Sequence, residues 1–135
     1  MGKLAMVAHG PHGALQGWRI LVVEDDWFEA EDLHRELERE GAEVLGPVPG
    51  VARALDVLVG SLRPTAALLD VRLGGEVVYP VADLLRSLAV PFAFVTACLH
   101  RDLPPAYAAV PFCPKPVALR QLVRAMKSLT VHASR

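Results

Sequence analysis

The sequence has few of the residues that build covalent or metal-held frameworks, and its charges nearly cancel. Only two cysteines are present, Cys98 and Cys113, and neither belongs to a CxxC or a Cys/His spacing. These features exclude a disulfide scaffold and a cysteine-rich metal site, so we expect both residues to be reduced thiols. The formal net charge of −1 and the lack of a lysine and arginine cluster argue against direct DNA binding.

Long apolar runs are also missing. No run approaches the roughly 20 residues that a membrane-spanning helix needs, and the first residues lack the continuous apolar core of a secretion signal. We therefore expect a soluble, cytoplasmic protein that has no contact with a membrane. The chain has 135 residues, of which 53% are hydrophobic, and this is enough for one packed domain but not for two.

What the sequence does contain is a regular alternation of short apolar runs and amphipathic stretches. It predicts strands at 19–24, 43–48, 65–70, 91–96 and 110–113, and helices at 27–40, 51–61, 80–88 and 117–129, with a short helical piece before the last strand. Five such βα units indicate an α/β fold with a parallel sheet between helices. We expect residues 1–18 to be a flexible tail, 19–129 the domain and 130–135 a short C-terminal tail.

The first predicted helix is amphipathic. The expected members of its buried stripe are Phe28, Ala30, Leu33 and Leu37. Its acidic residues, Glu29 among them, are expected to line the solvated face. Asp26 stands just before this helix and has the residue type of an N-cap.

Polar residues stand at or just after the ends of four predicted strands. Glu24 and Asp25 belong to the first strand end, Asp70 to the third, Thr96 to the fourth and Lys115 to the fifth. Because parallel strands end at the same edge of a sheet, these side chains are expected to meet there. Carboxylates at one point repel one another unless a cation is present, so this cluster predicts bound Mg²⁺.

Magnesium prefers oxygen ligands and keeps several waters. Asp25 and Asp70 are the predicted direct ligands, and Glu24 is predicted to lie one water away. Lys115 adds a positive charge on the opposite side, and Thr96 adds a hydroxyl donor. Together these groups are what a site needs to stabilise a phosphoryl group during its transfer.

The polar segments, taken in order and with βα spacing between them, resemble the signature segments of bacterial response-regulator receiver domains. The segments are Val23-Glu24-Asp25-Asp26, Leu69-Asp70-Val71, Val95-Thr96-Ala97 and Lys115-Pro116. The similarity spans residues 19–129. It implies a flavodoxin-like (βα)5 fold with a doubly wound, five-stranded parallel sheet.

The resemblance also implies a role for each matching residue. The phosphoacceptor corresponds to Asp70, and the metal ligands to Glu24, Asp25, Asp70 and the backbone carbonyl of Arg72. The remaining site residues correspond to Thr96 and Lys115, and the switch residues to Thr96 and Phe112. The Lys115-Pro116 peptide bond is expected to be cis.

The segment between Thr96 and Lys115 departs from the family. It holds only 18 residues with Pro104-Pro105 in its middle, and a proline pair blocks a long helix. We expect a shortened fourth helix, no more than a turn around Tyr107. We also expect low local stability there, so that residues 97–109 reorganise on phosphorylation.

Two further features bear on the subgroup and on the site. Phe94 and Thr96 match a subgroup of stand-alone receivers marked by Phe-Ala-Thr-Gly-x-Tyr, although the other marked positions differ. The loop that begins at Arg72 is longer than usual, and the helix after it is expected to begin at Pro80. His9 and His12, in the predicted tail, are interpreted as solvated residues rather than as metal ligands.

The predicted function is that of a single-domain response regulator. Asp70 would accept a phosphoryl group from a histidine kinase or a histidine phosphotransfer protein, with Mg²⁺ as cofactor. No enzymatic activity is expected beyond Mg²⁺-dependent self-phosphorylation and dephosphorylation. Because only a short tail follows Leu129, the output is expected to pass through contacts with another, unidentified protein.

Three alternatives remain beside this hypothesis. A pseudo-receiver would dock partners without phosphorylation, and the complete set of acid, hydroxyl and lysine residues argues against it. A hydrolase of the haloacid-dehalogenase kind needs a second aspartate at the position of Arg72. Flavodoxin-like cofactor binding needs a phosphate loop rich in Ser, Thr and Gly after the first strand, which is absent here.

Overall fold

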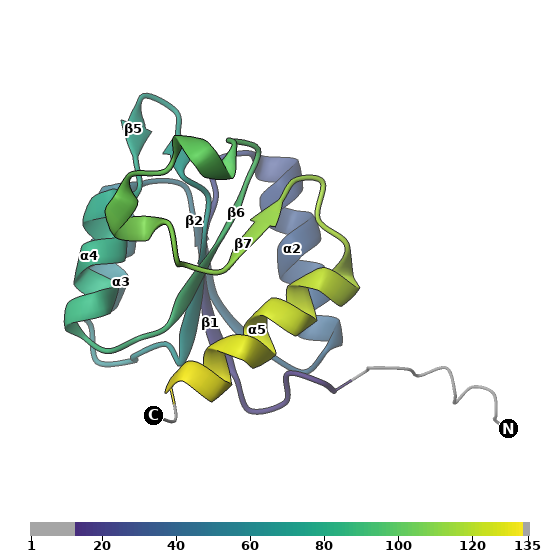
Figure 1. Cartoon of the computed structure of the whole chain (residues 1–135). Coiled ribbons are helices and arrows are strands. Elements are labelled where there is room, and N and C mark those ends of the chain that lie inside the picture. Colours follow the sequence, from purple (N-terminus) through teal and green to yellow (C-terminus); the bar gives the residue numbers. More distant parts are fainter. Residues whose placement is uncertain (1–12, 134–135) are drawn as a thin grey trace, which may run out of the picture.

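A five-stranded parallel sheet forms the centre of the molecule (Figure 1). The computed structural model describes residues 13–133. The strands lie in the order β2-β1-β3-β6-β7, with the bounds β1 (Arg19–Val23), β2 (Glu43–Val48), β3 (Ala66–Leu69), β6 (Phe92–Thr96) and β7 (Phe112–Pro114). The strand order reverses between β1 and β3, which in such sheets is where binding sites form. The predicted flavodoxin-like architecture is confirmed.

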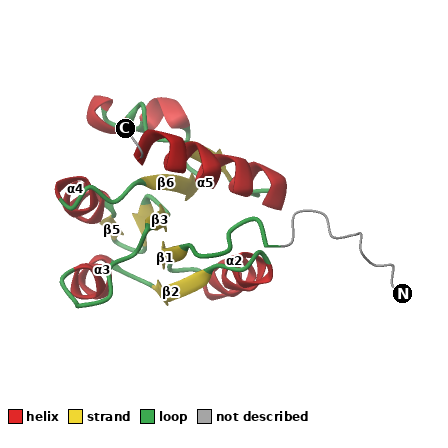
Figure 2. Ribbon diagram, turned by 90° about the horizontal axis from the view of Figure 1, so that it is seen from below, coloured by secondary structure: helices red, strands yellow, loops and turns green. Residues whose placement is uncertain are grey.

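Two helices cover each face of the sheet. Figure 2 shows α2 (Trp27–Arg39) and α5 (Leu119–Ala133) on one side, and α3 (Val51–Leu58) and α4 (Tyr79–Ser87) on the other. The N-cap prediction for α2 is confirmed, since the Asp26 carboxylate accepts a hydrogen bond from the Glu29 N–H at 3.0 Å. The last helix begins two residues later than predicted and continues into the predicted tail 130–135.

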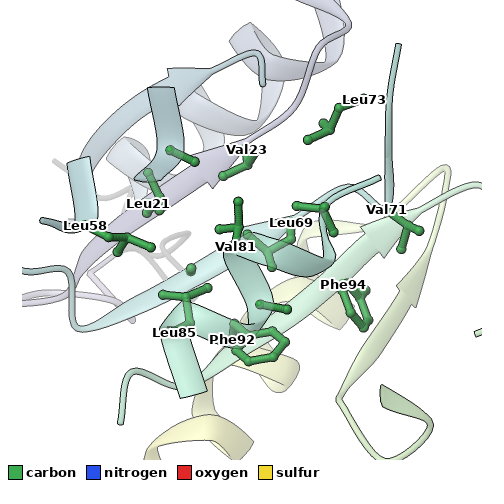
Figure 3. Packing of buried hydrophobic residues seen from close by; sticks show 14 of the residues in the cluster. Leu21, Val23, Leu58, Leu69, Val71, Leu73, Val81, Leu85, Phe92 and Phe94 are labelled. Carbon is green, nitrogen blue, oxygen red and sulfur yellow. The ribbon is translucent and has the colours of Figure 1, made fainter. Parts of the chain in front are cut away.

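Apolar side chains on the two faces of the sheet form two separate cores. Successive strand residues point to opposite faces, so Leu21 faces α3 and α4 while Ile20 faces α2 and α5. Figure 3 shows the first core, where Leu69 and Phe94 lie among side chains of these helices. All four residues of β3 are buried, as expected for a central strand between two helical layers.

One predicted core residue is wrong. Phe28 is 76% exposed, and its ring packs edge-to-face on the equally solvated Trp27. The helical period explains the error: Ala30 and Leu37 share one face of α2, whereas a residue two positions from Ala30 lies about 200° around the helix. The aromatic residues at the start of α2 are therefore a surface feature rather than part of the core.

Part of the predicted N-terminal tail packs against the domain. Leu15 is fully buried in the α2 and α5 core, and its N–H donates to the Glu40 carbonyl at 2.9 Å. The Gly-rich composition hid this one apolar anchor. His9 and His12 lie outside the described residues.

Two connections at the carboxyl edge of the sheet have structure of their own. Between β3 and α4 the chain forms an antiparallel hairpin, β4 (Arg72–Leu73) and β5 (Glu76–Val77), which the sequence did not predict. Between β6 and β7 there is no regular α-helix, only two 3₁₀ turns, η1 (His100–Asp102) and η2 (Pro105–Tyr107). The expected shortening of the fourth helix is confirmed, and the turn lies at Tyr107 as predicted.

Proline geometry agrees with the sequence at one position and adds another. The peptide bond Lys115-Pro116 is cis, as the resemblance implied, and Gly46-Pro47 is also cis. Gly46 has a φ of 93°, and a Cβ there would lie 2.7 Å from the Val48 nitrogen. Only glycine fits this turn in β2, where the pairing of β1 with β2 shifts register.

Candidate functional site

The predicted polar residues lie together at the carboxyl edge of the sheet. Glu24 follows β1, Asp70 follows β3, Thr96 ends β6 and Lys115 follows β7. The main chain fixes two of these positions: the Asp70 N–H donates to the Val23 carbonyl at 2.9 Å, and the Lys115 N–H donates to the Thr96 carbonyl at 3.0 Å. The adjacent strands β1, β3, β6 and β7 thus set the spacing of the side chains.

Three carboxylates form the centre of the site. Oxygen atoms of Glu24, Asp25 and Asp70 all lie within 4.8 Å of one another. Glu24 and Asp70 are buried, with 5% and 8% of their surface exposed, whereas Asp25 is exposed. One oxygen of Glu24 accepts the Asp26 N–H at 3.0 Å. The sequence prediction that these acids meet in space therefore agrees with the structure.

Lys115 follows the edge strand β7, and its side chain contacts the carboxylates. Its Nζ donates to Glu24 Oε1 at 2.6 Å and to Asp70 Oδ2 at 2.7 Å, and it also pairs with Glu29. Burial alone would lower the pKa of Lys115, but hydrogen bonds to Asp70, Glu24 and Glu29 raise it above its ordinary value. The ammonium is therefore charged at any physiological pH.

The negative charge of the site exceeds what one lysine neutralises. Burial raises the pKa of Glu24, the hydrogen bonds from Lys115 and the Asp26 N–H oppose this, and the charge of Asp70 adds to the increase. Carboxylate oxygens at this spacing are the donors that Mg²⁺ prefers. Asp25 and Asp70 have free lone pairs for direct ligation, while both Glu24 oxygens already accept hydrogen bonds. The donor set therefore fits Mg²⁺.

The β4–β5 hairpin borders the acidic cluster. Arg72, whose backbone carbonyl is the further predicted ligand, begins this hairpin two residues after Asp70. At its turn, a Cβ on Gly74 would lie 3.7 Å from Asp25 Oδ2. The hairpin thus brings main chain close to Asp25, one of the predicted metal ligands.

Thr96 ends β6 at the carboxyl edge of the sheet, and Phe112 begins the neighbouring strand β7. Thr96 is 1% exposed, and its hydroxyl oxygen accepts the Cys98 N–H at 3.3 Å. Phe112 is half-buried, and His100 packs edge-to-face against its ring with a centroid distance of 5.3 Å. His100 Nε2 in turn lies 2.8 Å from the Ala108 carbonyl oxygen. This histidine is thus engaged with the aromatic side chain and the main chain.

Sequence reasoning missed Glu29 as a member of the site. It was assigned to the solvated face of α2, yet it reaches Lys115 from the first turn of the helix. The sequence held no local signal for this contact, because Lys115 comes from a distant part of the chain. Beside this pair lies a cavity of about 580 Å³ between α2 and α5, with Glu24, Glu29 and Lys115 in its lining. The lysine is therefore reachable from outside.

Comparisons with known proteins give consistent relatives. None of the protein-family models matches the chain. The chain is 34% identical over 107 residues to the phyllosphere-induced regulator PhyR of Methylorubrum extorquens, an alignment that covers 73% of this chain and 40% of PhyR. Overall the chain spans 40 to 53% of the length of the two curated relatives that it matches.

Solved structures extend the similarity over nearly the whole domain. SdrG from Sphingomonas melonis superimposes with a TM-score of 0.72 and 34% identity, covering 87% of this chain and 98% of SdrG. The response regulator TrrA from Thermotoga maritima, solved in complex with Mg²⁺-BeF, gives a TM-score of 0.70 and 26% identity over 83% of this chain and 98% of TrrA.

Proposed function

The chain belongs to the receiver domains of response regulators, and from this premise we propose that it accepts a phosphoryl group on Asp70 in a two-component phosphorelay. The observation that carries the proposal is the placement of the Asp70 carboxylate. It lies 2.7 Å from the Lys115 ammonium and within 4.8 Å of oxygens of Glu24 and Asp25. An anionic nucleophile between a fixed cation and a cation-binding acid pair is suited to phosphoryl transfer.

In the proposed reaction the donor is a phosphohistidine of a histidine kinase or a histidine phosphotransfer protein. A free oxygen of Asp70 attacks the phosphorus, a P–O bond forms, and the P–N bond breaks so that the imidazole nitrogen leaves with the electron pair. Lys115, already charged, offers its ammonium to the phosphoryl oxygens as their charge develops. Mg²⁺ held by Asp25, Asp70 and the Arg72 carbonyl would neutralise the same oxygens.

Thr96 and Phe112 are the proposed switch. A phosphoryl group adds strong acceptor oxygens beside the Thr96 hydroxyl. In the structure the hydroxyl oxygen accepts a long hydrogen bond of 3.3 Å from the Cys98 N–H. Movement of Thr96 toward the phosphoryl group would free space for the half-buried Phe112 ring. The signal would then leave through contacts with a protein partner.

A pseudo-receiver that docks partners without phosphorylation is the second candidate function, because some members of a fold keep a surface without its chemistry. The pairing of Lys115 with three carboxylates favours the phosphorylated regulator, since it maintains a buried charge cluster that a docking module does not need.

Among the helices that the structure describes, none has the length and apolar character to cross a membrane.

Labelling with a small phosphodonor tests the proposal. The protein is treated with acetyl phosphate and Mg²⁺ and examined by intact-mass spectrometry, and a single phosphoryl adduct is expected. Asp70→Asn should abolish the adduct, whereas Asp102→Asn, which changes an exposed aspartate in η1, should leave it unchanged. No adduct on the wild type would favour the pseudo-receiver, and an adduct that persists in Asp70→Asn would mean that Asp70 is not the acceptor.

A further inference from the structure

The hairpin between Asp70 and α4 is anchored to the core by apolar side chains. Leu73 and Val78 are buried in the core that faces α3 and α4, and the Val78 N–H donates to the Val71 carbonyl at 2.9 Å. The contact between Val71 and Val78 closes the base of the hairpin, and Leu73, which pairs with Glu76 beside the turn, holds the first strand to the core. These contacts do not fix the exposed part of the hairpin, which includes Gly74, Gly75 and Glu76.

Glu76 ties this exposed part to a different element. Its Oε2 accepts a hydrogen bond of 3.0 Å from the N–H of Val51, the first residue of α3. Helix α3 has no side-chain cap of its own and no acidic residue in its first turn. The first N–H groups of a helix need acceptors, and the helix dipole favours a negative charge there. The Glu76 carboxylate therefore caps α3 from 25 residues away.

The residue before α3 makes room for this contact. A Cβ at Gly50 would lie 2.8 Å from Glu76 Oε2, closer than unstrained atoms approach. The φ of Gly50 is −157°, an extended conformation that any residue adopts, so backbone freedom does not explain the glycine. The approach of the carboxylate does explain it. Gly50 thus leaves the space that the Glu76 carboxylate occupies beside the start of α3.

The turn of the same hairpin, which directly precedes Glu76, reaches the acidic cluster. Gly74 is in the left-handed region with a φ of 63°, and the turn that it makes lies against the Asp25 carboxylate. Arg72 pairs with Val77 across the hairpin. Any tilt of the hairpin therefore displaces both the main chain at Arg72 and the Gly74 turn beside Asp25.

We propose that Glu76 is a positioning residue for the Mg²⁺ site, which it serves by tethering the hairpin to the N-terminus of α3. This inference rests on the proposed function, because it takes Asp25, Asp70 and the Arg72 carbonyl as the metal-binding groups. Glu76 itself binds no metal. Its carboxylate limits the positions that the hairpin samples, and Mg²⁺ affinity is highest in the tethered position.

The test is an Mg²⁺ titration followed by thermal unfolding of the apo and metal-bound protein, which gives a dissociation constant for each variant. Glu76→Ala removes the carboxylate, Glu76→Gln keeps an acceptor without the charge, and Gly50→Ala places a methyl group where Oε2 lies. The matched control is Glu43→Ala, which removes an exposed glutamate with one hydrogen-bond partner, Arg19, at the amino edge of the sheet.

Glu76→Ala should weaken Mg²⁺ binding by about threefold to tenfold, somewhat less than the loss typical of groups in direct contact with a metal ligand. Gly50→Ala should have a similar effect, Glu76→Gln a smaller one, and Glu43→Ala none. The double variant Gly50→Ala/Glu76→Ala should bind Mg²⁺ as Glu76→Ala does, because both changes break one contact. Hydrogen exchange at the Val51 amide should accelerate in both single variants.

Three outcomes would overturn the inference. Unchanged Mg²⁺ affinity in Glu76→Ala, together with faster exchange at the Val51 amide, would mean that the carboxylate caps α3 and does nothing for the metal. Additive losses in the double variant would mean that Gly50 and Glu76 act separately. If Mg²⁺ does not stabilise even the wild type, the metal-binding part of the proposed function fails as well, so the two failures are distinguishable.

Discussion

The two connections at the carboxyl edge of the sheet border the same site but are held by different forces. The hairpin connection, residues 70–78, meets the charged cluster and is tethered by the Glu76 carboxylate. The turn connection, residues 97–111, is held mainly by aromatic packing against α4, and Figure 1 shows its 3₁₀ turns beside that helix. A cation or a phosphoryl group acts directly on the first kind of contact and only indirectly on the second.

Tyr107 anchors the turn connection. Its ring is 7% exposed and stacks on Tyr79 with a centroid distance of 4.6 Å, and its hydroxyl donates to Asp83. The Arg86 guanidinium lies 4.9 Å from the centre of the same ring and donates to the Ala106 carbonyl at 2.6 Å. A segment without a regular helix is thus fastened at one point by several side chains of α4.

This comparison changes the expectation for the switch. The sequence predicted low local stability over residues 97–109 because the segment lacks a helix. The anchor at Tyr107, the buried side chain of Leu103 and the contacts of His100 indicate instead that only residues 97–99 are loosely held. Rearrangement on phosphorylation is therefore expected to concentrate at residues 97–99, ahead of η1.

The largest effect is expected when the aromatic anchor is removed. Tyr107→Ala deletes a buried ring and the stacking contact of that ring with Tyr79. The free energy of unfolding should therefore fall by about 3 kcal/mol. Chemical denaturation measures the loss, which should be the same with and without Mg²⁺. Leu99→Ala, at a 51% exposed position of the same connection, is the control and should cost little. A loss that depends on Mg²⁺ would show that the two connections are not held independently.

Sequence reasoning correctly placed the polar residues that stand at strand ends. The period of the apolar runs fixed the strands, and the parallel sheet then required Glu24, Asp70 and Lys115 to meet. The prediction from sequence failed where a contacting residue is distant in the sequence and where a strand is too short to show a pattern. The two-residue strands β4 and β5 are below the length at which alternation is visible.

Side-chain tethers were missed for a related reason. Glu29 and Glu76 look like ordinary exposed acids, because the groups that they contact come from other elements. The error at Phe28 has a different origin, since the helical period, applied strictly, places that residue opposite Ala30. Composition likewise hid Leu15, which stands in a stretch rich in glycine. Local pattern predicts elements well and contacts between elements poorly.

A second prediction concerns alkaline pH and the ionisation of Tyr107 in the aromatic anchor. Burial, together with the hydrogen bond to Asp83, raises the pKa of Tyr107 to about 12, whereas an unfolded tyrosine ionises near pH 10. Between these values the unfolded chain loses the proton first, so the stability that Tyr107 provides is intact below pH 10 and is lost as the pH rises toward 12. At pH 11 the loss amounts to about 1.4 kcal/mol.

Tyr107→Phe isolates this contribution, because Tyr79 and the other titrating groups remain in both proteins. The difference in unfolding free energy between wild type and Tyr107→Phe should fall by about 1.4 kcal/mol from pH 8 to pH 11. Urea denaturation at the two pH values measures it. A difference that stays constant would mean that Tyr107 ionises as readily in the folded protein as in the unfolded chain.

The smallest effect is expected in the charge-held region, and there its sign depends on Mg²⁺. Asp25→Ala removes one of three carboxylates whose oxygens lie within 4.8 Å, so repulsion falls and the apo protein should gain about 0.5 kcal/mol, a small value because Asp25 is exposed. The same change removes a proposed metal ligand, so stabilisation by added Mg²⁺ should disappear. In Asp25→Ala the free energy of unfolding of the apo protein should thus rise while the stabilisation by Mg²⁺ falls. A change at Tyr107 would not produce this pair of opposite effects.

Thermal unfolding with and without Mg²⁺ measures both quantities, and Asp56→Ala on the exposed side of α3 is the control for the loss of one negative charge. Equal Mg²⁺ stabilisation in Asp25→Ala and wild type would remove Asp25 from the ligand set, and a less stable apo variant would show that Asp25 supports the hairpin more than it repels its neighbours.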